Sequence, residues 1–353
     1  MKKNWFDEKI KKFSSIGGYQ KPDLIPNSVK LDSNENYVIS KQFQNDVITS
    51  AKKNSDVREY PLGRIDKLIK AISKFTKVPT SMIGVGNGSD QILDLILSNF
   101  ASKQTKVITS KPTFGFFEER CKLYSIPLIT IPFSDDMKLN IKDFVTQSKN
   151  ADILYLDSPN NPTGFQFSKI ELQKLIKSFN GLVIIDEAYG EFSEYSLASM
   201  VKNHDNLIVV QTLSKSFGLA GLRLGYFIAN KKFTDAFMNV LQYPYPLSTI
   251  TIESGILALE KSELMKKVVI DIKIERKRII ETLQKYDSFQ VFDSNANFVL
   301  FDAHGSYKRV YSALAEQGIS IRKLGKIGNH KGCLRVTIGT KEMNSKFLLA
   351  IRD

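Results

Sequence analysis

The sequence predicts an α/β protein in which a large domain, with a mixed and mostly parallel sheet flanked by helices, is joined to a smaller α+β domain. Between residues 106 and 229, short β-branched apolar runs alternate with stretches of helical periodicity, which is typical of a parallel sheet with crossover helices. After a long helical pattern, residues 289–338 return to short strands around a single helix. The length of 353 residues also exceeds what one hydrophobic core usually serves, so two domains are expected.

The large domain is expected to contain six strands, each a short apolar run bounded by polar or turn residues. These strands are predicted at 106–110, 128–133, 152–157, 182–186, 206–212 and 224–229. Helical periodicity covers 90–99 and 168–179. A long helix over 249–285 is expected to join the domains. In the small domain, strands are predicted at 289–292, 297–301, 319–322 and 333–338, with a helix over 307–316.

The chain carries 50 Lys and Arg against 37 Asp and Glu, a net charge of +13, which raises nucleic acid as a partner. However, the lysines occur in scattered pairs, and the densest basic run, 275–278, lies in a helical pattern that also carries acids. This distribution favours solvated helix surfaces over a nucleic-acid site. The same positive field would suit a phosphorylated small molecule.

Cysteine and histidine usage argues against a disulfide scaffold and a metal site. Cys121 and Cys333 lie far apart, and the three histidines are scattered. The chain starts without an apolar signal segment, and no apolar run approaches the ~20 residues that a membrane helix needs. A cytoplasmic protein with no membrane contact is therefore expected.

Lys215 is the first candidate for chemistry. It follows an apolar strand, in a small-residue turn over 212–226, where poor solvation would favour a neutral and nucleophilic amine. Such an amine is what an imine with an aldehyde cofactor requires. Ser214 and Arg223 stand near it in the sequence and are a pair suited to holding a phosphate. Taken alone, the segment is more typical of an exposed loop lysine and a structural arginine.

Two further strand ends support a ligand site. Asp186 ends the apolar run 182–186, and a buried acid needs a partner, which a protonated pyridine nitrogen would be. The loop 158–164, which contains Asn161, closes the preceding strand. Because the carboxyl ends of parallel strands meet at one edge of a sheet, these groups are expected to lie together.

Three motifs in this order, 161–164 (Asn-Pro-Thr-Gly), 186–189 (Asp-Glu-Ala-Tyr) and 214–215 (Ser-Lys) with Arg223 after them, resemble the fold type I pyridoxal-phosphate-dependent aminotransferases. The similarity covers nearly the whole chain. Within that superfamily the chain is most similar to the histidinol-phosphate aminotransferases. The segments that carry this finer similarity are 18–20, 31–36, 60–61, 112–114, 244–249, 295–298 and 332–340.

The resemblance implies pyridoxal 5′-phosphate as the cofactor. Lys215 would bind it covalently and move a proton between the substrate Cα and the cofactor, Asp186 would keep the pyridine nitrogen protonated, and Tyr189 would hydrogen-bond the 3-oxygen. The other implied cofactor contacts are Asn161 at the 3-oxygen, Phe114 on the ring face, Gly88, Ser89, Asp90, Ser214 and Arg223 at the phosphate, and Tyr60 at the phosphate of a neighbouring subunit.

The same resemblance implies histidinol phosphate and glutamate or 2-oxoglutarate as substrates, in histidine biosynthesis, and a homodimer with shared active sites. Arg322 and Arg335 would hold the anionic end of the substrate, while Tyr19 and Asn34 would line the opposite wall. The implied domain boundaries are 1–30 for an N-terminal arm and part of the small domain, 31–248 for the large cofactor-binding domain and 249–353 for the small C-terminal domain.

Some positions depart from the family pattern. Tyr37 stands where proline is usual, Gln91 where glutamate is frequent, and Phe114 lacks the hydroxyl of the commoner tyrosine but keeps the stacking face. Substrate choice in this fold depends on few side chains. An aromatic or broad-specificity aminotransferase, or a threonine-phosphate decarboxylase of the same fold, therefore remains an alternative, as does a nucleic-acid-binding protein that keeps the cofactor fold.

Overall fold

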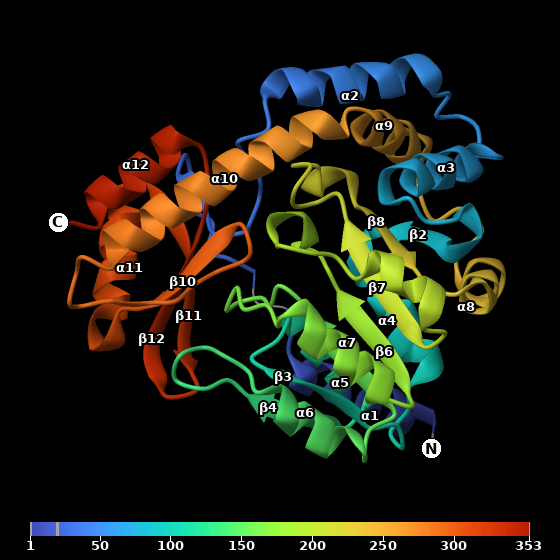
Figure 1. Cartoon of the computed structure of the whole chain (residues 1–353), viewed down its shortest axis with the longest axis horizontal. Coiled ribbons are helices and arrows are strands. Elements are labelled where there is room, and N and C mark those ends of the chain that lie inside the picture. Colours follow the sequence, from blue (N-terminus) through green and yellow to red (C-terminus); the bar gives the residue numbers. More distant parts are fainter. Residues whose placement is uncertain (1, 19–20, 353) are drawn as a thin grey trace.

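The computed structural model describes residues 2–18 and 21–352, which fold around two sheets (Figure 1). The larger sheet has seven strands in the order β2-β8-β7-β6-β5-β3-β4. All its strands run parallel except β8, which is antiparallel to both of its neighbours. Their bounds are β2 Ile83–Asn87, β3 Val107–Lys111, β4 Leu128–Pro132, β5 Ile153–Asp157, β6 Leu182–Asp186, β7 Leu207–Thr212 and β8 Leu224–Ile228.

Helices cover both faces of this sheet, so its strands are buried on both sides. Along β5, Ile153 and Tyr155 join one apolar cluster while Leu154 and Leu156 join the other, because successive side chains of a strand point to opposite faces. The first cluster includes side chains of α4 (Gly88–Phe100) and α5 (Gly115–Tyr124). The second includes side chains of α6 (Ile141–Ser148) and α7 (Lys169–Ser178).

The six strands predicted for this sheet are confirmed with small differences at their ends, but β2 was not predicted. Gly84 and Gly86 interrupt its apolar pattern, which hides the strand in the sequence. The structure explains Gly84, because a Cβ there would lie 2.2 Å from the ring of Phe227 on β8. The close approach of β2 and β8 therefore requires glycine at position 84, and the same glycine makes β2 hard to recognise from its apolar pattern.

The smaller sheet has five strands in the order β1-β11-β12-β10-β9. Its first strand comes from the N-terminal part of the chain and pairs parallel with β11, while the other pairs are antiparallel. The elements of this part are β1 Val29–Leu31, β9 Gln290–Val291, β10 Phe298–Asp302, α11 Tyr307–Glu316, β11 Ile319–Ile327, β12 His330–Thr337 and α12 Lys341–Ala350. The predicted helix over 307–316 is confirmed, and β11 is longer than predicted.

The single long helix predicted over 249–285 is wrong, because the structure has two helices there, α9 (Thr249–Glu260) and α10 (Ser262–Leu283). The chain leaves helical geometry at Lys261, with φ −92° and ψ 21°. Lys261 also bonds through Nζ to Asp46 of α2 at 2.6 Å. α9 packs against α2 (Lys41–Asn54) and α3 (Arg64–Thr76), whereas α10 continues toward the small sheet, as Figure 1 shows. The two helices have separate packing partners, which apolar periodicity alone does not reveal.

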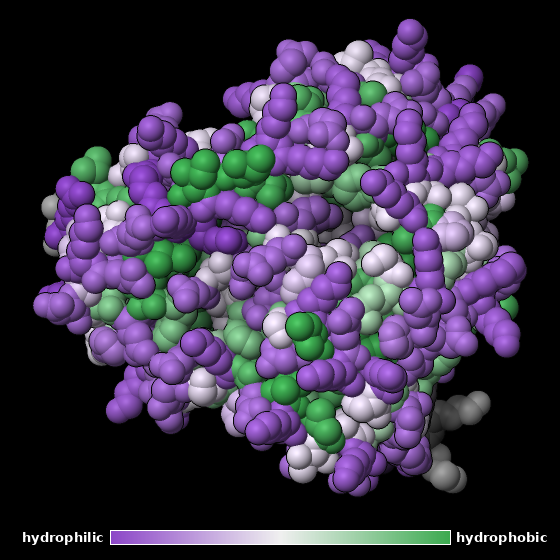
Figure 2. Space-filling model, viewed as in Figure 1, coloured by the Kyte–Doolittle hydropathy of each residue, from purple (hydrophilic) through white to green (hydrophobic). Residues whose placement is uncertain are grey.

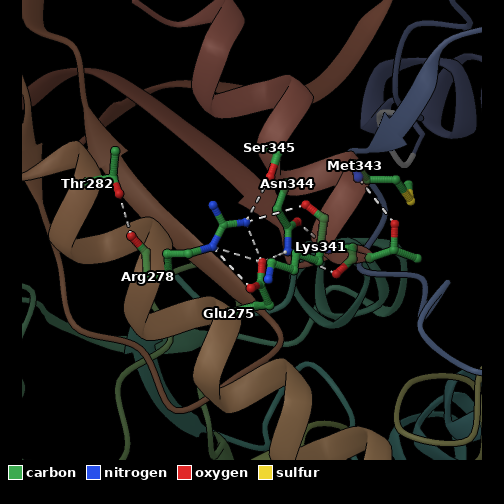
Figure 3. Close-up of polar contacts among 9 residues, drawn as sticks. Glu275, Arg278, Thr282, Lys341, Met343, Asn344 and Ser345 are labelled. Carbon is green, nitrogen blue, oxygen red and sulfur yellow. Dashed lines mark hydrogen bonds and ion pairs between the residues drawn. The ribbon is translucent and has the colours of Figure 1, made fainter.

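Polar contacts fix α10 to α12 (Figure 3). Glu275 accepts hydrogen bonds from Arg278 on its own helix and, at 2.8 Å, from Asn344 Nδ2 on α12. Asn344 is fully buried and also caps the turn before α12 by accepting from the Gly339 N–H at 2.8 Å. This network fixes the end of α10 against the small sheet.

The N-terminal helix α1 (Lys2–Ile16) lies against α5, where Lys12 Nζ donates to Ser125 Oγ at 3.1 Å. The remaining short elements are α8 (Lys231–Ala236) and single turns at Thr80–Met82, Gly190–Phe192, Ala198–Asn203, Ala220–Leu222, Phe237–Leu241 and His304–Ser306. Within the described residues, no helix combines the length and the apolar character needed to cross a membrane. The face in Figure 2 is mostly hydrophilic, with an apolar area over the middle of α10, where Ile270 and Ile274 are exposed.

Candidate active site

A cavity of about 330 Å³ lies where the two sheets face each other, and residues of both line it. Asp157, Asp186 and Thr212 are the last residues of β5, β6 and β7, so the floor of the cavity is the carboxyl edge of the large sheet. Arg322 and Arg335 come from β11 and β12 of the small sheet.

The structure brings most of the predicted site residues into this cavity. Those in its lining are Asn34, Ser89, Asp90, Phe114, Asn161, Asp186, Tyr189, Ser214, Lys215, Arg223, Arg322 and Arg335. Gly88 lies directly beside the lining, as the first residue of α4. Tyr60 lies outside the cavity: its side chain is 71% exposed and stacks on Tyr245 with ring centroids 4.3 Å apart. Tyr19 lies outside the described residues.

Asp186 is a buried acid at the centre of the floor. Its carboxylate accepts hydrogen bonds from the Ala188 N–H at 3.0 Å and from the Tyr155 hydroxyl at 3.1 Å. Burial and, after it, the negative charge of Asp157 raise the pKa of Asp186 to about 7, against the opposing effect of those hydrogen bonds. Among the described residues, no cation forms an ion pair with Asp186. A cationic ligand atom at this position would therefore be strongly favoured.

Lys215 projects into the cavity from the loop after β7. Its Nζ donates to the Ser33 carbonyl oxygen at 3.2 Å and lies 5.7 Å from the centre of the Tyr189 ring. The loop that carries Lys215 is also held by Asn36, whose Nδ2 donates to the Ser216 carbonyl oxygen at 2.7 Å. The amine is thus held between the floor of the cavity and the segment that follows β1.

The opposite end of the cavity is suited to an anion. Here α4 begins, so its first amides point outward without helical partners, and the positive end of the helix dipole faces the cavity. Arg223 lies over this end, 3.0 Å from Asp90 Oδ2 and 3.5 Å from Ser214 Oγ. Gly88 has φ +76°, and a Cβ there would lie 2.6 Å from Arg223 Nη2. A glycine is therefore needed for the arginine to approach the helix end this closely.

Between these ends, side chains from both sheets are coupled by hydrogen bonds. Arg335 donates from Nη1 to Asn161 Oδ1 and from Nη2 to the Asp32 carbonyl oxygen at 3.0 Å. Asn34 Nδ2 donates to the Tyr189 hydroxyl oxygen at 2.8 Å. Burial raises the pKa of Tyr189 to about 12, against the effects of Arg335 and Asn34, so the phenol stays protonated at neutral pH.

Arg322 and Arg335 are direct partners in the antiparallel register of β11 and β12. Like charges directly opposite each other weaken a sheet, so this placement is costly for the fold alone. Both side chains line the cavity, on the side of the small sheet. Two guanidinium groups on one wall suit a ligand with a doubly charged or extended anionic group.

Sequence reasoning missed several lining residues. Asp157 is the most consequential, since it is only 7% exposed and lies beside Asp186 in the sheet. It ends an apolar strand in the same way as Asp186, and that signal was available in the sequence. Other residues absent from the prediction are Pro22, Asp32, Ser33, Phe116, Ala188, Thr212 and Ala220. Pro22, Asp32 and Ser33 belong to the N-terminal segment, which long-range pairing brings to the site, whereas the other four lie within three residues of predicted positions.

The residues present fit pyridoxal 5′-phosphate. The cofactor needs an acid for its ring nitrogen, an amine for its aldehyde and an anion site for its phosphate. Asp186, Lys215 and the α4 end with Arg223 offer these three groups around one cavity. The strongest single observation is the buried Asp186 carboxyl, which has no cation among the described residues to balance it.

Comparisons with known proteins agree with this arrangement. The family described as "Aminotransferase class I and II" matches residues 26–351. A histidinol-phosphate aminotransferase of Pyrococcus furiosus is 34% identical over 324 residues, which cover 92% of this chain and 91% of that protein.

Solved structures agree as well. A histidinol-phosphate aminotransferase of Clostridium acetobutylicum is similar with a TM-score of 0.84 and 27% identity, covering 91% of this chain and 97% of that one. The fold also matches that of the Sinorhizobium meliloti histidinol-phosphate aminotransferase in complex with pyridoxal-5′-phosphate, with a TM-score of 0.82, 23% identity and coverage of 91% and 90%. On the family match and the relative from Pyrococcus, the chain belongs to the class I and II aminotransferases.

Proposed function

We propose that the protein is a pyridoxal-phosphate-dependent aminotransferase that converts L-histidinol phosphate and 2-oxoglutarate into imidazole-acetol phosphate and L-glutamate, in histidine biosynthesis. The observation that carries the proposal is the cavity itself. Its lining combines the Lys215 amine, the buried acid Asp186, the first turn of α4 with Arg223, and a pair of arginines from the small sheet. The relatives named histidinol-phosphate aminotransferase support the choice of substrate.

When bound, pyridoxal phosphate supplies a protonated ring that delocalises the electron pair left at the substrate α-carbon. Asp186 would hold the proton on the ring nitrogen, because its own buried charge would be stabilised by that cation. Tyr189 and Asn161 would donate hydrogen bonds to the oxygen on the ring. Lys215 would take the proton from the substrate α-carbon and deliver it to the aldehyde carbon of the cofactor, two bonds away, after which addition of water would release the keto product.

The substrates differ in their anionic ends, and the arginine pair accommodates both. Histidinol phosphate presents a phosphate, whereas glutamate presents carboxylates, and a guanidinium fork pairs with either group. Arg335 is firmly positioned, since Asn161 and Asp32 both accept its hydrogen bonds. Arg322 is partly exposed on the neighbouring strand. Asn34, held by Tyr189, lines the same cavity.

The decisive experiment is a half-reaction followed by visible absorbance. Protein loaded with pyridoxal phosphate is mixed with L-histidinol phosphate in the absence of any keto acid. We expect the band of the loaded protein to convert to that of the pyridoxamine form, and 2-oxoglutarate to restore it. Lys215→Ala should abolish the conversion, whereas Lys174→Ala, at an exposed lysine of α7, should leave it unchanged.

Other outcomes would move the assignment. A band that responds only to aromatic amino acids would make the protein an aromatic aminotransferase. Release of carbon dioxide from threonine phosphate would make it a decarboxylase. Failure to form any visible band would contradict the role of Lys215.

We also propose that the protein works as a homodimer with shared active sites. Tyr60 is exposed and lies outside the cavity of its own chain. Its ring stacks on Tyr245, which joins two segments that both carry exposed apolar residues. The other exposed apolar residues of these segments are Val57 and Leu62 before α3 and Val240 and Tyr243 before α9.

Mixed dimers test this proposal. Tyr60→Ala and Lys215→Ala chains should each be nearly inactive at low cofactor concentration, and an equimolar mixture that exchanges chains at random should regain up to about a quarter of wild-type activity. The gain arises because one site then combines the Lys215 of one chain with the Tyr60 of the other. The control mixes the Tyr60→Ala chain with a chain that carries both Tyr60→Ala and Lys215→Ala. This mixture should regain no activity, because neither chain supplies Tyr60. A monomer in sedimentation at micromolar concentration would overturn the proposal.

A further inference from the structure

Asp157 is a second buried acid at the floor of the cavity. It ends β5 as Asp186 ends β6, and the two residues are direct partners in the parallel register. Asp157 is 7% exposed and Asp186 3% exposed, and both line the cavity. Nothing in the sequence analysis or in the proposed mechanism assigns a role to this residue.

The contacts of Asp157 all stabilise a carboxylate. Thr113 Oγ1 donates to Oδ1 at 2.8 Å, Asn160 Nδ2 donates to Oδ1 at 2.9 Å, and the Asn161 N–H donates to Oδ2 at 2.8 Å. Burial raises the pKa of Asp157 to about 6, and these three hydrogen bonds limit the rise. The group is therefore ionised at pH 8 although it is buried.

Two consequences follow from this position. First, the carboxylate fixes the turn that carries Asn161, since it binds the backbone of Asn161 and the side chain of Asn160. Second, it places a negative charge beside Asp186, and among the described residues neither acid forms an ion pair. The other titratable groups coupled electrostatically to these acids are Asp90, Tyr155 and Tyr189, and Arg335 on the small sheet acts in turn on Tyr189.

We propose that Asp157 is a further positioning residue for the cofactor, which orders the Asn160–Asn161 turn and supplies a second negative charge that favours a protonated ring nitrogen at Asp186. The proposal rests on the proposed use of pyridoxal phosphate. In this proposal Asp157 and Asp186 act as a pair of buried acids, where the proposed function uses Asp186 alone. A cationic ring that binds beside them neutralises negative charge that is already buried in the fold.

Cofactor analogues separate the charge effect from the ordering effect. Apo-protein is titrated with pyridoxal 5′-phosphate and with its 1-deaza analogue, in which a CH group replaces the ring nitrogen and cannot be protonated. For Asp157→Asn we expect the affinity for pyridoxal phosphate to fall at least about tenfold, and the affinity for the 1-deaza analogue to fall several-fold less. The visible absorbance of the loaded protein changes with pH as the bound cofactor loses its proton. In Asp157→Asn the midpoint of this change should move to lower pH, because the protonated, cationic form of the cofactor loses a neighbouring anion.

Two further variants serve as controls. Asp271→Asn removes the same charge from an exposed position of α10 and should change neither affinity nor midpoint. Thr113→Val keeps the carboxyl but removes one of its hydrogen bonds, so it should shift the midpoint in the same direction as Asp157→Asn by a smaller amount. If Asp157→Asn proves unfolded by circular dichroism, Thr113→Val decides the question.

The outcomes are distinct. Equal loss of affinity for both cofactors, or an unchanged midpoint in the folded variants, would overturn the charge role of Asp157. Wild-type affinity and midpoint in Asp157→Asn would overturn the proposal as a whole and leave the proposed function intact. Wild-type protein that binds no pyridoxal phosphate would instead contradict the proposed function.

Discussion

The two buried aspartates determine how the stability of the cofactor-free protein depends on pH. Burial raises the pKa of Asp186 to about 7 and that of Asp157 to about 6, whereas an unfolded aspartate titrates near 3.8. The folded state therefore binds protons more tightly than the unfolded state. Stability should be highest at low pH, within the range where the protein stays folded, and should fall as the pH rises through 6 to 7.

The size of this effect can be measured by urea unfolding of the apo-protein between pH 5 and pH 8. Each pKa unit corresponds to ~1.4 kcal/mol, so we expect a loss of a few kcal/mol over that interval. Asp186→Asn should reduce the slope and raise apo stability at pH 8. Glu191, whose pKa burial also raises to about 7, should account for part of the remaining slope. An unchanged slope in Asp186→Asn would contradict this account.

Residues at strand ends could be predicted from the sequence, while residues brought in by long-range contacts could not. Asp186, Asn161 and Lys215 follow apolar strands, and topology alone places such residues at one edge of a sheet. Ser33, in contrast, enters the site because β1 pairs with β11, far along the chain. Tyr60 has no local signal at all, and its assignment came only from family resemblance.

At the scale of elements, the crossing of β8 and α4 shapes the anion site. Gly225 on β8 pairs with Gly86 on β2, and a Cβ at position 225 would lie 2.3 Å from the Ser89 nitrogen and 2.4 Å from the Gly88 carbonyl carbon. Both contacts are with backbone of the first turn of α4, which cannot yield as a flexible side chain would. The glycine on β8 thus sets where the helix begins.

We expect Gly225→Ala to displace this first turn. Overpacking of this kind typically costs ~1–3 kcal/mol, so the melting temperature should drop by several degrees. The affinity for pyridoxal phosphate should fall at least about tenfold, measured by titration of the apo-protein. Gly221→Ala is the matched control, since a Cβ there has nothing within 4 Å, and it should leave both quantities unchanged. Normal affinity in folded Gly225→Ala would show that α4 is not the phosphate site.

Element boundaries were predictable where one strand or helix carried its own pattern. The parallel strands and α11 have continuous apolar runs or clear periodicity, and they were placed within a few residues. β2 was not predicted, because Gly84, which lets the strand pack closely against β8, interrupts its apolar pattern. The break between α9 and α10 escaped because both helices are apolar on one side, and only the change of packing partners separates them.

At the scale of the whole molecule, a polar contact links the two sheets at the rim, away from the anion site. His330 on β12 contacts Asp302 Oδ2 through Nδ1 at 3.1 Å and the Asp135 carbonyl oxygen through Nε2 at 2.9 Å. Asp135 belongs to the segment between β4 and α6, on the large-sheet side. Next to it, Met137 packs in a small cluster with Phe292, Leu300, Ile327 and Cys333 of the small sheet.

This contact affects catalysis through geometry. Arg322 and Arg335 lie on the two strands that the His330 hairpin joins, while Lys215 lies on the loop after β7. The distance between these arginines and the Lys215 amine therefore depends on how firmly the hairpin is fixed to the large sheet. Loosening the contact should weaken substrate binding more than it slows the chemical step, because it leaves the floor of the cavity unchanged.

His330→Phe tests this coupling, since it keeps a ring beside Phe292, 5.0 Å away between centroids, and removes the hydrogen bonding of the imidazole. Because both partners are acceptors, we count one donated hydrogen bond, which contributes ~0.5–1.5 kcal/mol, and expect KM to rise about two- to tenfold with kcat within about twofold of wild type. The control is His304→Asn. His304 is exposed, its imidazole lies beside Asp302 of the same sheet, and asparagine tolerates its φ of +51°. A fall in kcat with unchanged KM in His330→Phe would show that the hairpin acts on the chemical step, and that substrate binding does not depend on this junction.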